Sequence, residues 1–370
     1  MKKIAICVTN DLVADQRVNK TAYSLSNNNF DITIIGRQLK NSLPVNCNYK
    51  TKRFKLLFNK GFLFYANYNI RLFFYLLFSD FDIFLSNDLD TLPACYYASR
   101  LKKKPIIYDS HELFTEVPEL VNRNFVKNFW TKIEKHILPK LRYTYTVCQS
   151  IADIYNKKYK TSFKVVRNIP VCKNTEKEQI KHSTEKIILY QGAVNKGRGL
   201  EQIIKAMPFI NNAKLLIIGD GDVLKDLKHL ANKLDINNKI KFTGKIPFEK
   251  LKPITQTADL GISLEQNIGL NYYYALPNKI FDYIHSNIPI LASDLPEIKN
   301  IIEKYNVGEL INDFSPESLS QKINNLLNND KKLNLYKQNT YTAAKELCWQ
   351  TEEKIILEIF SSIKNKKRKS

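Results

Sequence analysis

The chain has 370 residues, too many for one modest hydrophobic core, and this length suits two α/β domains. Its composition, 44% apolar and 25% charged, is that of an ordinary globular protein. Its six cysteines are scattered and form no Cys-x-x-Cys pair, so the sequence has neither the zinc motif nor the dithiol motif built on that spacing. Such cysteines fit a reduced compartment. The net charge of +21 favours a polyanionic partner or an anionic membrane surface. Lysine enrichment throughout the sequence explains this charge equally well. No nucleic-acid recognition motif accompanies the charge.

Short apolar runs alternate with helical patterns along the first half of the chain. The predicted strands are Ile4–Val8, Ile32–Ile35, Ile83–Ser86, Ile106–Asp109 and Thr144–Cys148. The predicted helices between them are Gln16–Ser26, Leu92–Leu101 and Asn124–Leu138. This alternation indicates a mostly parallel sheet with right-handed crossovers.

The segment Phe62–Phe78 is strongly aromatic. Arg71 and two asparagines interrupt it, whereas about 20 apolar residues are needed to cross a bilayer, so we do not expect a transmembrane helix. A buried helix and an interfacial helix both remain open for this segment.

The second half repeats the alternation after residues 170–183, which are polar, lack periodicity and predict a linker. The predicted strands are Ile187–Gln191, Lys214–Ile218, Ile240–Thr243, Leu260–Leu264 and Pro289–Ala292. The predicted helices are Leu200–Met207, Val223–Leu234, Pro247–Thr255, Asn278–Ser286 and a final stretch over Lys331–Lys364. The basic cluster Lys364–Lys369 is either a solvated tail or a contact for lipid head groups.

The segment Ala275–Pro296 has the features of a nucleotide-binding corner. Pro277 suits the start of a helix, where backbone N–H groups and Lys279 would face an anion such as a diphosphate. Asp282 follows about one turn later and can reach the hydroxyl groups of a ribose. A glycine-rich turn over 192–199 adds two cations, although such turns are also common without a ligand.

The Ala-Leu-Pro-Asn-Lys run that ends at Lys279, the Phe-Asp-Tyr that follows it and the Gly-Asp-Gly turn at 219–221 resemble the donor-site signature of family 4 glycosyltransferases. That family often carries two glutamates separated by seven residues. Asp282 takes the place of the second, and Tyr274 stands where the first would fall.

The resemblance implies an α/β fold of the GT-B type, with two Rossmann-like doubly wound domains facing a central cleft and a C-terminal helix crossing back to the first domain. It implies an acceptor-side domain over residues 1–169, a linker over 170–183 and a nucleotide-sugar-binding domain over 184–345. The returning helix and basic tail would occupy residues 346–370.

The resemblance also implies a donor site. The residues that would contact the diphosphate are Gly192, Lys196, Arg198, Asn278 and Lys279. Asp282 would bind the ribose, and His111 and Glu265 would lie near the donor sugar as catalytic candidates.

Several residues of the first half match family turns on the acceptor side of the cleft, namely Asp15, Arg17, Asp88 and Glu112. The run Tyr108–Phe114 resembles the family's Asp-x-His-Glu turn, which brings His111 to the sugar. A lone loop histidine is structural more often than catalytic, and Asp15 and Asp88 can equally be helix caps.

Two Asp-x-Asp pairs, Asp220 with Asp222 and Asp88 with Asp90, have the spacing that binds a divalent ion in GT-A glycosyltransferases. Both would lie in strand-to-helix turns, where acids commonly cap helices. We therefore expect metal-independent transfer, with no metal or cofactor and with the nucleotide sugar as co-substrate.

The resemblance as a whole implies a cytoplasmic retaining glycosyltransferase. It would move a sugar from a nucleotide diphosphate sugar, UDP-linked by expectation, to a surface glycan such as lipopolysaccharide or capsule, or to a lipid-linked acceptor. Apart from the resemblance, the net charge, the aromatic segment Phe62–Phe78 and the basic tail favour a peripheral contact to the inner face of the membrane, and we expect no nucleic-acid partner. A nucleotide-sugar epimerase of similar shape and a non-catalytic subunit for glycan assembly remain alternatives.

Overall fold

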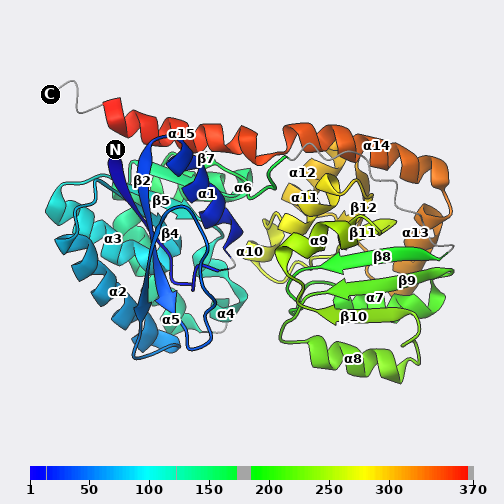
Figure 1. Ribbon diagram of the computed structural model, residues 1–370. Coiled ribbons are helices and arrows are strands. Elements are labelled where there is room, and N and C mark those ends of the chain that lie inside the picture. Colours follow the sequence, from blue (N-terminus) through cyan, green and yellow to red (C-terminus); the bar gives the residue numbers. More distant parts are fainter. Residues whose placement is uncertain (14, 122, 173–184, 366–370) are drawn as a thin grey trace. The chain divides into compact units, whose positions relative to one another are not determined.

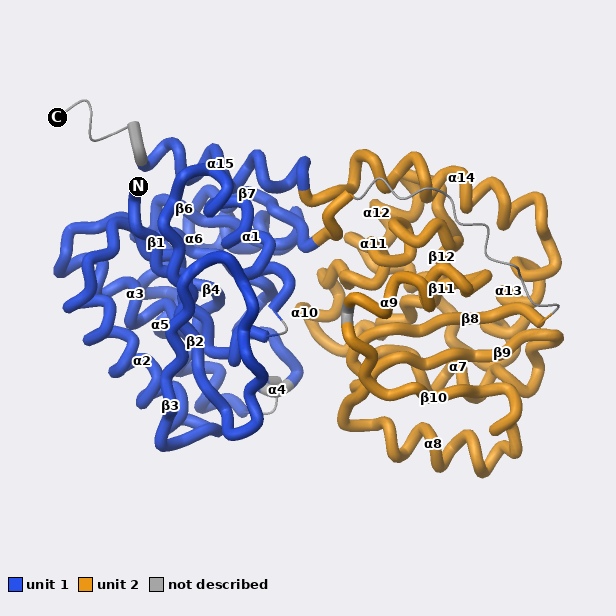
Figure 2. Tube along the Cα trace, in the orientation of Figure 1, with its two compact units in different colours: residues 1–168, 350–370 blue, residues 169–349 orange. Residues whose placement is uncertain are grey.

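The computed structural model describes residues 1–13, 15–121, 123–172 and 185–365. They fall into two compact units: unit 1 comprises Met1–Asn168 and Gln350–Ser370, and unit 2 comprises Ile169–Trp349 (Figure 2). Most of the predicted linker 170–183 and most of the basic cluster Lys364–Lys369 lie outside the described residues.

Unit 1 is built on a seven-stranded parallel sheet with the order β3-β2-β1-β4-β5-β6-β7. Its strands are β1 Lys2–Cys7, β2 Phe30–Gln38, β3 Lys50–Lys55, β4 Ile83–Asn87, β5 Ile106–Ser110, β6 Tyr143–Thr146 and β7 Lys164–Val165. Its α-helices are α1 Gln16–Asn27, α2 Gly61–Phe78, α3 Asp88–Lys102, α4 Pro118–Val121, α5 Asn124–Ile137, α6 Gln149–Tyr159 and, apart from its first residue, α15 Trp349–Asn365. Helices cover both faces of the sheet (Figure 1).

The two faces of β1 show why helices flank this sheet on both sides. Alternate strand residues point to opposite faces, and Ala5 and Cys7 pack with the buried residues of α2 and α3. On the other face, α15 joins unit 1 through the ring contact of Phe30 with Phe360 at 5.7 Å and a hydrogen bond from Ser24 to Glu353 at 2.6 Å. The predicted return of the C-terminal helix to the first domain is thus confirmed.

The stretch predicted to be helical over Lys331–Lys364 consists of two helices. Helix α14 (Asp330–Glu346) ends before Leu347, and α15 begins at Trp349. The imidazole Nε2 of His285 bonds the Leu347 carbonyl at 2.7 Å, and the Trp349 N–H donates to the Pro170 carbonyl at 2.8 Å. Because both backbone groups are engaged outside the helix, the helical hydrogen-bond pattern is interrupted at this point.

Unit 2 is built on a six-stranded parallel sheet with the order β10-β9-β8-β11-β12-β13. Its strands are β8 Lys186–Gln191, β9 Ala213–Ile218, β10 Ile240–Gly244, β11 Leu260–Ser263, β12 Ile290–Ser293 and β13 Gly308–Ile311. Its α-helices are α7 Leu200–Ala206, α8 Leu224–Lys233, α9 Phe248–Thr255, α10 Leu270–Tyr273, α11 Asn278–His285, α12 Pro296–Tyr305, α13 Pro316–Leu327 and α14 Asp330–Glu346.

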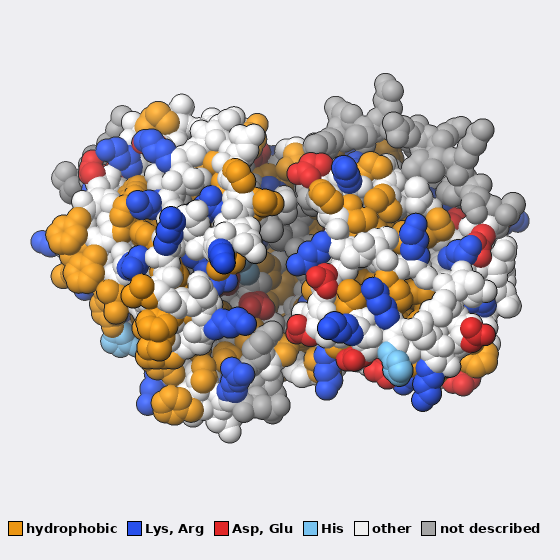
Figure 3. Space-filling view, turned by 60° about the horizontal axis from the view of Figure 1, so that its bottom comes forward, with side chains coloured by type: hydrophobic (Ala, Val, Ile, Leu, Met, Phe, Trp, Pro, Cys, Tyr) orange, Lys and Arg blue, Asp and Glu red, His pale blue; other side chains and the backbone are white. Residues whose placement is uncertain are grey.

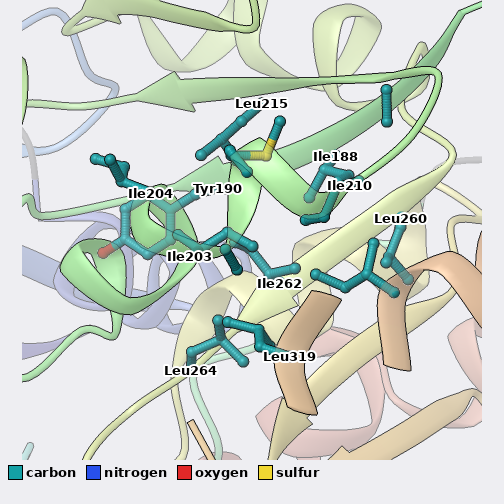
Figure 4. Close-up of a cluster of buried hydrophobic side chains, with 14 of the residues drawn as sticks. Ile188, Tyr190, Ile203, Ile204, Ile210, Leu215, Leu260, Ile262, Leu264 and Leu319 are labelled. Carbon is teal, nitrogen blue, oxygen red and sulfur yellow. The ribbon is translucent and has the colours of Figure 1, made fainter. Parts of the chain in front are cut away.

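The core of unit 2 has two layers that share the sheet. Ile188 and Tyr190 face the layer that contains α7, α8 and α13 (Figure 4). Leu189, which points the other way, packs with α11, α12 and α14. A strand buried on both faces needs an unbroken apolar run, as β8 has.

Both sheets reverse their strand order at one point, between β1 and β4 in unit 1 and between β8 and β11 in unit 2. Connections on the two sides of such a switch point run to opposite faces of the sheet, and they leave a crevice at the carboxyl ends of the strands. The predicted pair of Rossmann-like doubly wound domains is therefore confirmed. Across the described ranges, no helix is both long enough and apolar enough to span a membrane.

Candidate active site

The turn that follows β8 lies at the switch point of unit 2 and has three glycines with left-handed backbone. Gly192, Gly197 and Gly199 have φ values of +133°, +82° and +68°. A Cβ on Gly199 would lie 2.3 Å from the carbonyl oxygen of Leu264, so only glycine lets this turn pass over the end of β11. The turn and the segment after β11 are therefore held together by backbone packing.

A buried carboxylate between two cations occupies this junction. Glu265 is fully buried, and its Oε1 lies 2.6 Å from the Lys279 Nζ and 3.5 Å from the Arg198 guanidinium. The Ser263 hydroxyl donates to its other oxygen at 2.6 Å. Burial pushes the pKa of Glu265 upward, but Lys279 and Arg198 outweigh it and hold the pKa below its ordinary value. Glu265 is thus an anion, and the three charged groups sum to +1.

Each of the two cations also lies against an aromatic ring. The Lys279 ammonium lies 4.3 Å from the centre of the Tyr190 ring, and the Arg198 guanidinium lies 4.8 Å from that of Tyr272. The Nε of Arg198 is buried without a hydrogen-bond partner, while its side chain is 25% exposed. The hydrogen-bond donors of Arg198 are therefore not all used within the protein, and its partly exposed side chain can donate to an anion that reaches the site.

The first turn of α11 adds backbone donors to the same site. The helix begins at Asn278, which is exposed, and Pro277 is its N-cap without a side-chain capping bond. A helix start of this kind presents N–H groups and the positive end of its dipole. Further along α11, Asp282 accepts a hydrogen bond from Gln191 Nε2 at 2.9 Å, and Gln191 in turn accepts from Thr255 at 2.7 Å. The carboxylate of Asp282 is thereby fixed at the end of β8.

Lys196 and the acidic turn after β9 lie at the rim of the same sheet edge. The Lys196 side chain is exposed, and its carbonyl oxygen accepts from the Tyr272 hydroxyl at 3.2 Å. Asp220 accepts the N–H of Gly221 at 2.9 Å, and the N–H of Asp222 donates to Asn195 at 3.3 Å. Both aspartates are exposed turn residues, and among the described residues no three His, Cys, Asp or Glu side chains form a group that could hold a metal ion.

A second polar cluster lies at the switch point of unit 1. The guanidinium of Arg17 binds both carboxylate oxygens of Asp109, with distances of 2.9 and 2.7 Å, and donates to the Val166 carbonyl at 2.7 Å. Both side chains are buried. Arg17 thus ties α1 to the carboxyl end of β5.

His111 lies between two carboxylates of this cluster. Its Nδ1 is 3.2 Å from Asp88 and its Nε2 is 3.2 Å from Asp109, while its backbone N–H donates to Asp88 at 2.8 Å. Burial lowers the pKa of His111, but the two carboxylates raise it to about 9, so the ring carries a positive charge at neutral pH. Asp88 itself has a left-handed backbone with φ +57°, an uncommon conformation for a non-glycine residue.

The remaining acceptor-side residues have local roles. The carboxylate of Asp15 accepts a hydrogen bond from the Val18 N–H at 3.0 Å and caps α1. This is the helix-capping role that the sequence offered as the alternative to an acceptor contact. Glu112 accepts at its carbonyl from the Ser110 hydroxyl at 2.8 Å. Asp88 is the first residue of α3 and pairs with His111, and the N-cap residue Asn87 makes no side-chain capping bond. The structure therefore brings Arg17, Asp88 and His111 together.

Sequence reasoning missed Asp109, which joins Arg17 to His111, and Ser263 and Gln191, which hold Glu265 and Asp282. All three are the last or next-to-last residues of predicted strands. These three residues could have been predicted as site residues because each is a polar side chain at the carboxyl end of a buried strand.

Two family models match consecutive parts of the chain. The model described as Glycosyltransferase Family 4 matches residues 16–176, and the model described as Glycosyl transferases group 1 matches residues 173–343. An uncharacterized glycosyltransferase of Methanocaldococcus jannaschii is 29% identical over 321 residues, which cover 80% of this chain and 79% of the relative.

Solved structures share the fold at low sequence identity. WaaG, a glycosyltransferase involved in lipopolysaccharide biosynthesis, has a TM-score of 0.69 with 15% identity and covers 96% of this chain and 99% of its own. HepE of Anabaena, solved in complex with UDP-glucose, has a TM-score of 0.75 with 13% identity and covers 98% of this chain and 100% of its own. With its two Rossmann-like units and both family models in sequence order, the chain belongs to the glycosyltransferases of the family 4 type with the GT-B fold.

Proposed function

We propose that this glycosyltransferase moves a sugar from a UDP-linked donor, with retention of the anomeric configuration, to a surface glycan or a lipid-linked acceptor at the face of an anionic membrane. One observation carries the donor assignment. Two cations, Lys279 and Arg198, meet a single buried carboxylate at the switch point of unit 2, where Rossmann-like sheets bind nucleotides. The net positive charge and the free donors suit a diphosphate.

In this proposal the diphosphate lies across the Gly192 turn and the first turn of α11. Arg198 and Lys196 contact it from the turn, and Asn278 and Lys279 contact it from the helix. The absence of a Cβ at Gly192 keeps the approach open, since the atom nearest to such a Cβ is the Lys279 Cε at 3.5 Å. Asp282 accepts hydrogen bonds from the ribose hydroxyls. The cations stabilise the charge that develops on the leaving UDP, and no metal ion is required for this.

Glu265 acts in this proposal as a positioning residue. A fully buried carboxylate that is engaged by Ser263 and Lys279 is poorly placed to contact the sugar. It instead holds the two cations next to each other and balances part of their charge while no UDP is bound.

His111 acts through its charge. Both ring nitrogens are engaged by carboxylates and the ring is protonated at neutral pH, so His111 is poorly suited to accept a proton. We propose that it holds Asp88 in its left-handed conformation beside the donor sugar, with Asp15, Arg17 and Glu112 shaping the acceptor side.

The proposed UDP-linked donor is supported by the complex of HepE with UDP-glucose. The proposed glycan acceptor is supported by the involvement of WaaG in lipopolysaccharide biosynthesis. Retention rests on the family resemblance alone. Slow hydrolysis tests the reaction without knowledge of the acceptor, because water can replace the acceptor hydroxyl and release UDP and free sugar.

The experiment incubates the chain with a panel of UDP-α-sugars and records proton NMR spectra before the free sugar mutarotates. The proposal predicts that UDP and the α anomer appear together and that release continues in EDTA. Appearance of the β anomer would contradict retention, loss of activity that Mn²⁺ restores would contradict metal-free transfer, and a UDP-linked epimer would identify an epimerase.

A further inference from the structure

Helix α2 is apolar on both of its faces. Phe64, Tyr68, Leu72 and Leu76 point into the core of unit 1 at helical spacing. Large apolar side chains also occupy the outward stripe, namely Phe62, Leu63, Ile70, Phe74 and Phe78, which are 51–82% exposed. A surface helix that covers a core ordinarily has polar residues on its outer face, so burial in this unit does not explain the outward stripe of α2.

The apolar surface continues onto α5. The ring of Phe62 lies 5.8 Å from that of Phe129 in an edge-on contact, which joins the two helices. Phe125 is 88% exposed, and Val126 and Phe129 also face solvent. Figure 3 shows hydrophobic side chains gathered over unit 1, with Lys and Arg side chains beside them. Contiguous exposed apolar surface of this kind marks an interaction site.

The charges on these two helices are of one sign. Helix α2 contains no acidic residue, and its only charged residue, Arg71, is exposed. The only acidic residue of α5, Glu134, is fully buried and bonded by Lys158 and Tyr159. The charged side chains that α5 exposes, Lys132 and Lys135, are basic. The outward faces of α2 and α5 therefore present apolar and positively charged groups without a carboxylate.

This combination favours one kind of partner. A second copy of the chain would bring its own basic side chains to the same face and another net charge of +21. Repulsion between the two positively charged copies therefore opposes self-association. An anionic bilayer offers phosphate groups at the level of the basic side chains and an apolar interior for the aromatic ones.

We propose that the outer faces of α2 and α5 are the surface by which the protein binds an anionic lipid bilayer. The aromatic side chains of α2 enter the boundary between head groups and acyl chains, and Arg71, Lys132 and Lys135 contact lipid phosphates. This inference rests on the membrane contact in the proposed function and gives that contact a location on unit 1.

Vesicle sedimentation of the full chain tests the apolar part. The probes are vesicles of phosphatidylcholine alone and of phosphatidylcholine with phosphatidylglycerol, each over a salt series. The variant Ile70→Asn/Phe74→Asn/Phe78→Asn changes only exposed side chains and should partition at least tenfold more weakly, most visibly at high salt. Its matched control, Phe209→Asn/Leu335→Asn, changes exposed apolar residues of unit 2 and should bind as the wild type does.

A charge variant tests the electrostatic part. Lys132→Gln/Lys135→Gln should weaken binding to anionic vesicles at low salt by roughly 25-fold, because each basic side chain near an anionic surface contributes a factor of about five. Lys250→Gln/Lys331→Gln removes the same charge from exposed positions of unit 2 and should have a smaller effect.

The controls separate the surface from the donor site. Every variant should bind UDP like the wild type, since none touches the switch point of unit 2. Sedimentation of the aromatic variant at the wild-type level would overturn the proposal, as would a wild-type dimer in ultracentrifugation that the aromatic substitutions dissociate. Normal vesicle binding without UDP binding would instead refute the donor assignment and leave the lipid surface standing.

Discussion

At the residue scale, the structure is most informative about charges that lie far apart in the sequence. Lys279 and Arg198 are cations of predicted ligand turns, and their nature as anion-binding groups follows from the sequence. That both meet Glu265 does not follow, because the partner comes from a different strand end and no local pattern encodes the pairing. The same holds for Asp109, which links Arg17 and His111.

The environment of His111 predicts a pH-dependent stability. Its pKa is about 9 in the folded protein and 6.5 ordinarily, so the folded state holds the proton more tightly. The resulting stabilisation of the folded state is complete below pH 6.5 and disappears as the pH rises through 9. The difference between the two pKa values corresponds to about 3 kcal/mol of unfolding free energy. The free energy of unfolding from denaturant titration should therefore fall across this window.

The variant His111→Gln should lack the stabilisation that comes from the protonated imidazole. The difference in unfolding free energy between wild type and variant should therefore shrink toward high pH. His229→Gln, at an exposed position of α8, is the control and should follow the wild type. A wild-type-minus-variant difference that stays constant from pH 6 to pH 9.5 would refute the charged state of His111.

The role assigned to Glu265 gives a second prediction. In Glu265→Gln the two cations lose their buried counter-ion, and breaking a buried ion pair costs about 3–5 kcal/mol. The melting temperature should fall in the absence of ligand, and UDP should raise it by more than in the wild type, because the diphosphate supplies the missing negative charge.

Differential scanning fluorimetry with and without UDP measures both quantities. Glu201→Gln, which removes the exposed pair with Lys205, should change neither. If UDP raises the melting temperature of Glu265→Gln by less than that of the wild type, the diphosphate does not replace the buried carboxylate as a counter-ion, and the role assigned to Glu265 is wrong.

At the element scale, the sequence predicts the strands and helices that have a strong apolar period and misses those without one. The edge strand β3 is Lys-Thr-Lys-Arg-Phe-Lys, in which only Phe54 is buried, so its pattern resembles a solvated loop. Helix α2 is the opposite case, since its apolar residues leave the buried and interfacial alternatives open. The structure confirms burial for one face of α2, while the other face is exposed to solvent and its interfacial role stays a prediction.

Replacing either of two glycines with similar left-handed backbone by alanine should cost different amounts of unfolding free energy. Gly199 lies in the turn after β8, and Gly244 is the last residue of β10. Gly199 and Gly244 have nearly the same left-handed φ, +68° and +72°. An added Cβ meets the Leu264 carbonyl at 2.3 Å in the first case and nothing within 4 Å in the second. Gly244→Ala should therefore cost about 1–2 kcal/mol of unfolding free energy, and Gly199→Ala clearly more.

Denaturant titration of both variants measures the two costs, and UDP titration reports the local consequence. Gly199→Ala should also weaken UDP binding, since the turn can no longer pass over β11. Equal unfolding free energies for the two variants would show that the close packing of this turn on β11 is not maintained in solution.

At the scale of the whole molecule, the sequence predicts two parallel α/β units because each half repeats the alternation of strand and helix. The strand orders β3-β2-β1-β4 and β10-β9-β8-β11 are then set by right-handed crossovers and by the reversal after the third strand. The return of α15 to unit 1 was available only through the family resemblance, because a long amphipathic helix carries no local signal of which core it covers.

In the proposed function, the cationic cluster at the switch point of unit 2 binds the diphosphate of the donor. Calorimetric titration of UDP into wild type, Arg198→Ala and Arg142→Ala tests it most directly. Arg142 is an exposed arginine that lies 5.5 Å from the Tyr143 ring, much as Arg198 lies against Tyr272, so it controls for loss of charge and ring contact. A charge-assisted contact to phosphate contributes about 1.5–3 kcal/mol, so Arg198→Ala should raise the Kd at least tenfold while Arg142→Ala leaves it unchanged. Equal affinities for the two variants would contradict the account.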